Sequence, residues 1–329
     1  MSLTRATMWL TVFLCVSVAA AAFAAGSSEA PAATSGSPSV SAAYPLTITD
    51  DGGSSLTIAR KPERIVSVTL FTDEILVDLV DRRRLVAVTT FAQDPDVSNV
   101  ASRVADIPNK VTLSVEPILG LRPDLVFVSS WSEADKVKQL RDAGVAVFLV
   151  GSGLTVAEIQ GKIREVARAV GEGERGESIV TAMLARIGAV AKVVATVPQD
   201  KRLRVLDYAT WGSAQGAGSS WDEIVRSAGL VNVAASLQAD QYGQVPLSKE
   251  KLVELDPDIL ILPGWVYGDP KGAGAFYRQV LEDPALKGMR AIREKRSYQM
   301  PERLKSSVSQ YLAEAVEFLA RTAYPELFR

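Results

Sequence analysis

Short apolar segments alternate with amphipathic segments along most of the chain. Runs rich in Val and Leu predict buried strands, and segments with helical spacing, such as 73–80 and 133–143, lie between several of them. The expected strands are 65–70, 85–89, 125–128, 146–150, 203–208 and 297–300. Alternation of this kind predicts mostly parallel sheets that are covered by helices.

The middle of the chain, 155–195, has helical spacing throughout. The stretch GEGERG at 171–176 interrupts it, and because no strand precedes this stretch we interpret it as a helix break, not a dinucleotide fingerprint. The second helix has an apolar stripe at Ile179, Met183 and Ile187. A helix of about 20 residues reaches roughly 30 Å, enough to span a small domain.

This pattern divides the chain into two lobes. We expect an N-terminal lobe at 44–170, a connecting helix at 171–196 and a C-terminal lobe at 197–329. The predicted fold class is α/β: two Rossmann-like lobes with mostly parallel sheets, joined by one long helix, with a ligand cleft between them.

The first 24 residues differ from the rest. Arg5 precedes an apolar run at 8–24, and Ala22-Phe23-Ala24 fits the cleavage rule, so a signal peptide is expected and not an uncleaved anchor. Leu14 stands before Cys15, where a lipoprotein site needs a small residue, so lipid attachment is not expected. Residues 25–43 are small and polar and predict a disordered tether.

One segment occurs twice with an offset of 134 residues and no gap. Residues 113–131 match 247–265 at seven identical positions. They are Leu113/Leu247, Ser114/Ser248, Glu116/Glu250, Leu121/Leu255, Pro123/Pro257, Asp124/Asp258 and Trp131/Trp265. Each copy predicts a serine N-cap, a short helix and a buried strand that starts after Pro-Asp. Each tryptophan follows its strand, at the sheet edge where open α/β folds bind ligands.

A second correspondence links the lobes. A strand, a loop and the sequence Asp-Glu-Ile at a helix start occur at 64–80 and again at 204–229. Glu74 and Glu223 are therefore expected at equivalent positions. From the residues alone, each glutamate is explained by the favourable interaction of a carboxylate with the dipole at the start of its helix.

Composition narrows the function. The 329 residues carry a net charge of −2 without a basic cluster, so a nucleic-acid partner is not expected. There is no histidine and only one cysteine, which excludes His/Cys metal sites and triads that depend on histidine.

Aromatic residues outside the periodic segments predict a large, flat, partly apolar ligand. These are Trp131, Trp211, Tyr242, Trp265 and Tyr267, and Arg303 is a candidate partner for an anionic group.

The chain resembles the substrate-binding proteins of ABC importers for vitamin B12, ferric siderophores and haem, whose two lobes are joined by a rigid helix. The resemblance spans about 45–329 and rests on stretches such as LSVEPILGLRPDLVFVSS, SSWDEIVRSAGLVNVAA and LSKEKLVELDPDILIL. It implies an extracytoplasmic monomer that delivers a small-molecule metal chelate to a permease and its ATPase. It also implies that one glutamate per lobe docks on the permease, and we assign Glu74 and Glu223 to that role.

The expected ligand is an iron-siderophore complex, with a corrinoid as the alternative. Haem is less favoured because there is no histidine, and the N-terminal lobe has no tyrosine after Tyr44. A carboxylate-dependent extracellular enzyme needs a close acidic pair, whereas Asp124 and Asp258 are expected at the edge opposite the tryptophans. A non-transporting sensor or adhesin would not need the docking glutamates. No catalytic residue, cofactor or directly bound metal is therefore predicted.

Overall fold

The computed structural model describes residues 43–329. The predicted signal peptide, Cys15 and nearly all of the predicted tether lie outside this part of the chain. A hairpin of β1 (Leu46–Thr49) and β2 (Ser55–Ile58) opens the described part, on either side of a turn at Asp51-Gly52-Gly53.

The N-terminal lobe contains a five-stranded parallel sheet with the order β5-β4-β3-β6-β7. Its strands are β3 (Ile65–Ser67), β4 (Leu85–Thr89), β5 (Asn109–Val111), β6 (Leu125–Ser129) and β7 (Val147–Val150). Its helices are α1 (Leu70–Leu79), α2 (Val115–Gly120), α3 (Ala134–Asp142) and α4 (Val156–Val170), with the 3-10 turns η1 (Arg82–Arg84), η2 (Thr90–Gln93) and η3 (Ala101–Arg103).

The C-terminal lobe contains a four-stranded parallel sheet with the order β10-β8-β12-β13. Its strands are β8 (Arg204–Asp207), β10 (Val231–Asn232), β12 (Ile259–Pro263) and β13 (Ser297–Met300), and β9 (Ser213–Gln215) pairs antiparallel with β11 (Gln244–Pro246). Its helices are α6 (Ser220–Ser227), α7 (Lys249–Leu255), α8 (Gly272–Glu282), α9 (Arg290–Arg293), α10 (Glu302–Lys305) and α11 (Leu312–Ala323). The 3-10 turns are η4 (Gln199–Lys201), η5 (Val233–Ser236) and η6 (Pro325–Phe328).

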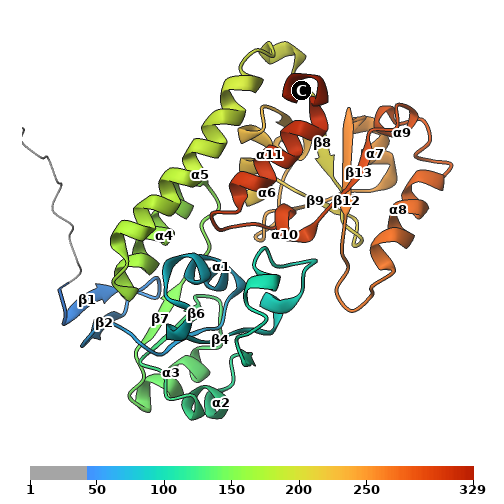
Figure 1. The fold of residues 1–329 in the computed structure, drawn as a ribbon. Coiled ribbons are helices and arrows are strands. Elements are labelled where there is room, and N and C mark those ends of the chain that lie inside the picture. The colour runs from blue at the N-terminus through green and yellow to red at the C-terminus, as the bar shows by residue number, and fades with distance from the viewer. Residues whose placement is uncertain (1–42) are drawn as a thin grey trace, which may run out of the picture. The chain divides into compact units, whose positions relative to one another are not determined.

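Helix α5 (Gly173–Val194) connects the two sheets and lies along α4 and α11 (Figure 1). The predicted break is confirmed, because α4 ends at Gly171, which has the left-handed φ of 73° that glycine adopts without a Cβ penalty. A capping box between Thr155 and Glu158 fixes the start of α4. The predicted fold class of two α/β lobes joined by one long helix is confirmed.

Both sheets are covered on two faces, and alternate residues of β6, β7 and β12 enter different cores. In β12, Ile259 and Ile261 join a core that also contains α5 residues and the N-terminal strand residue Phe127, whereas Leu260 and Leu262 face a separate core beneath α7, α8 and α9. The outer face of the N-terminal sheet packs on α2 and α3. The two inner faces therefore share one apolar core along α5.

In both lobes the repeated segment ties the start of its strand to the neighbouring strand and to the end of the short helix. We call this set of contacts the structural staple. Asp124 accepts hydrogen bonds from the backbone N–H groups of Glu63 and Arg64. The Arg64 guanidinium donates to the carbonyls of Leu121 and Arg122, just past the end of α2. In the second copy, Asp258 accepts from the N–H of Arg204, whose guanidinium donates to the last carbonyls of α7. Both aspartates thus anchor strand starts, at the edge opposite the tryptophans, and are committed to structure.

The copies also share an unusual backbone conformation. Arg122 and Asp256 stand at equivalent positions, and their φ angles are 49° and 38°. This left-handed conformation turns the chain from the short helix into Pro-Asp. Of the two predicted N-caps, Ser248 accepts from the N–H of Lys251, whereas Ser114 occupies the N-cap position without a side-chain cap bond.

A glycine substitution tests the close crossing of α4 and α5. A Cβ added at Gly176 would lie 2.5 Å from the Cβ of Ala167, whereas a Cβ at Gly188, in the same helix, would meet nothing within 4 Å. We expect Gly176→Ala to lower the free energy of unfolding by about 1–3 kcal/mol through overpacking. The matched control Gly188→Ala should raise it by about 0.5–1 kcal/mol, because alanine loses less backbone entropy. Denaturant titration measures both, and equal effects would contradict the packing argument.

Candidate functional site: an aromatic cavity beside the lobe junction

The two Asp-Glu-Ile helix starts are structural. Asp73 is fully buried in α1 and accepts hydrogen bonds from the N–H and hydroxyl of Thr89 at the end of β4. Burial raises the pKa of Asp73 to about 7. Asp222 in α6 accepts from the side chain of Asn232, in β10. Each aspartate therefore ties its helix to a neighbouring strand of its own lobe.

The glutamates of these motifs join distant segments. Glu74, 4% exposed, accepts hydrogen bonds from the N–H and amide of Asn99 and from the hydroxyl of Ser309, which belongs to the C-terminal lobe. Glu223 is partly buried and accepts from the N–H of Val156 at the start of α4. Docking on a permease requires an exposed carboxylate, whereas the carboxylate of Glu74 is buried and accepts hydrogen bonds inside the lobe junction.

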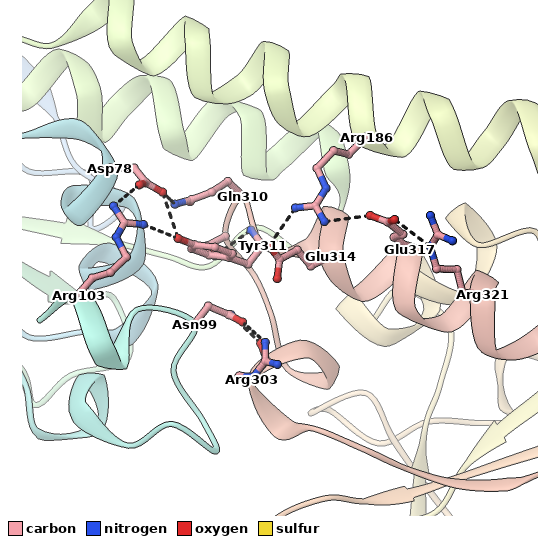
Figure 2. A network of polar contacts seen from close by, with 11 residues as sticks. Asp78, Asn99, Arg103, Arg186, Arg303, Gln310, Tyr311, Glu314, Glu317 and Arg321 are labelled. Atoms are coloured by element: carbon pink, nitrogen blue, oxygen red, sulfur yellow. Dashed lines mark hydrogen bonds and ion pairs between the residues drawn. The ribbon is translucent and has the colours of Figure 1, made fainter. Parts of the chain in front are cut away.

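Arg303 also belongs to this junction. Its guanidinium donates to the Asn99 side-chain oxygen at 3.1 Å (Figure 2). Its carbonyl accepts from the Asn99 amide at 2.8 Å, and its N–H donates to the carbonyl of Asp96. Beside it, Gln310 and Tyr311 contact Asp78. The predicted anion partner therefore lies outside the aromatic cavity and bridges the two lobes.

A cavity of about 460 Å³ opens at the carboxyl ends of β8, β12 and β13. This is the sheet edge at which open α/β folds bind ligands. Its wall carries the expected Trp211, Trp265 and Tyr267, and its floor is polar, formed by Asp207 and Lys305 with Glu302 and Ser306. Three of the expected aromatic residues thus lie in one cavity, and its polar floor was not expected from the sequence.

The aromatic wall continues toward the other lobe. Trp265 and Tyr267 meet edge to face at 5.9 Å between ring centroids, and Tyr267 lies 6.4 Å from Phe91 of η2 in the N-terminal lobe. Gly264 makes this loop possible, because a Cβ there would lie 2.5 Å from the carbonyl oxygen of Met300. Such rings offer flat apolar surface for a ligand face.

Besides Arg303, two predicted aromatic ligand residues do not line this cavity. Trp131 is 87% exposed and Tyr242 is 74% exposed, each on its own loop. Trp131 and Trp265 hold the same place in the repeat, yet only Trp265 reaches the cavity wall. The loops after the two strands differ in sequence, and the repeat alone could not reveal this difference.

The cavity floor contains a buried ion pair. Lys305 Nζ lies 3.0 Å from Asp207 Oδ2 and 5.8 Å from the ring centre of Trp221. The two side chains are 10% and 1% exposed, respectively. Burial lowers the pKa of Lys305, but the Asp207 and Glu302 carboxylates outweigh it, so the net pKa lies above the ordinary value and the ammonium stays charged. With Glu302, the cavity lining carries one net negative charge.

The described residues offer no direct metal site. Among residues 43–329, no group of three or more His, Cys, Asp or Glu side chains is arranged to hold an ion. Within the same range, no helix is both long enough and apolar enough to cross a membrane.

Comparison with known proteins agrees with this geometry. The family model described as periplasmic binding protein matches residues 65–304. The chain belongs to the periplasmic binding protein family. Within that family, a Bacillus subtilis protein named as an uncharacterized ABC transporter substrate-binding lipoprotein, YvrC, is 26% identical over 87% of this chain and 88% of its own length.

Two further relatives differ in the ligand that their names state. A cobalamin-binding protein of Halobacterium salinarum is 26% identical over 66% of this chain and 58% of its own length. The solved structure of the Haemophilus influenzae molybdate-binding protein MolA has a TM-score of 0.70 at 22% identity, over 86% of this chain and 92% of that one. This periplasmic binding protein therefore belongs to an ABC-type substrate-binding class whose members take different ligands.

Substitution of Glu74 tests the lobe junction. Glu74→Ala leaves buried donors of Asn99 and Ser309 without an acceptor, so the free energy of unfolding should fall by about 1–3 kcal/mol. Glu74→Gln keeps an acceptor and should cost less. Denaturant titration of both variants measures the difference, and equal losses would contradict the hydrogen-bond explanation.

The stability difference between the wild type and Glu74→Gln should depend on pH. Burial raises the pKa of Glu74, so the folded state favours the protonated acid, and that stability is lost as pH rises above the ordinary value of about 4.3. Glutamine does not ionise. The Glu74→Gln protein should therefore gain stability relative to the wild type as pH rises, and a constant difference would argue against a buried ionising group.

Proposed function

We propose that this protein captures a preformed metal chelate with a flat apolar face and delivers it to an ABC transporter permease. A corrinoid is the favoured ligand. The observation that supports the proposal is the cavity formed by Trp211, Trp265 and Tyr267 above a floor with one net negative charge. Flat rings favour a macrocycle, and the floor disfavours an anion.

The charge of the cavity separates the candidate ligands. Molybdate is a small dianion and haem carries two propionates, so both need cations that the lining does not supply, because Lys305 is neutralised by Asp207. An anionic ferric siderophore meets the same repulsion. A ferric hydroxamate with neutral or positive charge remains the second candidate, within the siderophore class that the sequence favours.

Delivery requires a docking surface, which we assign to Glu116 and Glu250. These repeat-matched residues lie in the first turns of α2 and α7, and both are exposed. Each helix runs antiparallel to the strand that follows it, so its start lies at the sheet edge of the cavity. One exposed carboxylate per lobe suits pairing with two permease arginines. Buried Glu74 and partly buried Glu223 suit that role less well.

The family and this assignment support an extracytoplasmic binding component that works with a permease and its ATPase. We propose that it acts as a monomer, with one ligand per chain. The carboxylate-dependent enzyme has less support, because Asp124 and Asp258 serve the structural staples and lie away from the cavity.

Ligand titration tests the assignment. Cyanocobalamin should quench tryptophan fluorescence, and haemin and molybdate should bind at least tenfold more weakly. Trp211→Ala and Trp265→Ala should each weaken binding by about 1–3 kcal/mol, because each removes apolar contact area. Trp131→Ala, a matched control outside the cavity, should change affinity little. Preference for molybdate or haemin would overturn the proposed ligand, and a dominant effect of Trp131 would move the site.

Transport assays test docking. Glu116→Ala with Glu250→Ala should leave ligand affinity intact and abolish uptake by the cognate permease in liposomes, since an interfacial arginine without its partner costs about 2 kcal/mol or more. The control Glu174→Ala with Glu326→Ala removes two exposed glutamates elsewhere. Normal uptake by the first double variant would refute the assignment.

A further inference from the structure

Among the described residues that line the aromatic cavity, Lys305 is the only one with a positive charge. It stands at the end of α10, and its side chain is nine-tenths buried between Asp207 and the ring of Trp221. Trp221 itself is 1% exposed, so the ring that faces the ammonium is fixed in the core. The ammonium is therefore held in a defined position and not on a flexible chain.

The Lys305 ammonium has more hydrogen-bond donors than it has partners among the described residues. A lysine ammonium has three N–H donors. Among residues 43–329, Asp207 is its only ion-pair partner, at 3.0 Å, and the Trp221 ring accepts no conventional hydrogen bond. Asp207 is fixed in turn, because its other oxygen accepts from the N–H of Gln215 at 2.9 Å. At least one ammonium donor is thus left to an occupant of the cavity.

We propose that Lys305 is a specificity residue that donates a hydrogen bond to an uncharged oxygen, such as an amide carbonyl, on the edge of a chelate whose flat face lies on Trp265. The proposal rests on the proposed function and names the peripheral chemistry of its ligand. A buried donor of this kind rejects an occupant without an acceptor, because the donor would then be left unsatisfied.

The carboxylates next to Lys305 explain why the acceptor oxygen of the proposed ligand is expected to be uncharged. Asp207 balances the lysine charge at contact distance, and Glu302 adds a negative charge to the same lining. A ligand carboxylate would gain one hydrogen bond and meet net repulsion, whereas an amide carbonyl gains the bond alone. Asp207 therefore sets the charge preference through Lys305 and acts as a positioning residue.

The experiment compares three variants by fluorescence titration with cyanocobalamin and with its monocarboxylic derivative, in which one peripheral amide is hydrolysed. Lys305→Met alone leaves Asp207 buried and unpaired, so the main variant is Lys305→Met with Asp207→Asn, which removes both charges together. Asp207→Asn alone unmasks the lysine charge. Lys287→Met, an exposed lysine of the same lobe, is the control, and denaturant titration verifies that each variant is folded.

The wild type should prefer the amide form. The double variant should bind cyanocobalamin about tenfold more weakly and lose the preference, as expected for a lost hydrogen bond to a charged donor. Asp207→Asn should shift the preference toward the acid. If the folded double variant binds cyanocobalamin as tightly as the wild type, or if Asp207→Asn keeps the preference for the amide form, the role of Lys305 is overturned. Either result would leave the proposed function standing.

A ferric desferrioxamine titration separates this result from failure of the proposed function. If the wild type binds that chelate and not cyanocobalamin, the same variants are measured on it, because its amide carbonyls offer equivalent acceptors. Retained affinity in the double variant would again overturn the role of Lys305. Failure of the wild type to bind any of these chelates would overturn the proposed function and the Lys305 assignment with it.

Discussion

One apolar core runs along α5 and receives side chains from the inner faces of both sheets. Phe127 of the N-terminal lobe and Ile261 of the C-terminal lobe belong to it, together with Val180 and Val190 of the helix. Separating the lobes by a large angle would expose this surface to water, at roughly 25 cal/mol per Å² of apolar area. The shared core therefore limits relative motion of the lobes and fixes where the two ligand-binding edges can lie.

Polar contacts reinforce this constraint at points that are equivalent in the two lobes. Glu74 reaches Ser309 of the other lobe, and Glu223 reaches the start of α4. Buried hydrogen bonds depend on geometry more steeply than apolar contacts do, so they set the relative orientation that the core leaves adjustable. The aromatic cavity is consequently built from side chains and loops on a stiff frame.

The sequence predicted the frame well because periodicity and the internal repeat report local backbone preferences. Strand β4 and the break before α5 were located correctly, since apolar runs and glycine act within a few residues. Contacts between distant segments leave no such pattern. Nothing local distinguishes Glu74 as buried or Arg303 as bridged to Asn99, and Lys305 enters the cavity only because α10 follows β13 at the ligand-binding edge.

The repeated staple separates two tasks that a binding protein has to reconcile. Arg64 with Asp124, and Arg204 with Asp258, hold each strand by contacts at its start, while the loops past the strand ends hold Trp131 in one copy and Trp265 in the other. Changes beyond Gly264 can thus alter the lining of the aromatic cavity without loosening the lobe. A scaffold arranged in this way is readily adapted, because new selectivity can arise in the loops while folding continues to depend on the opposite edge of the sheet.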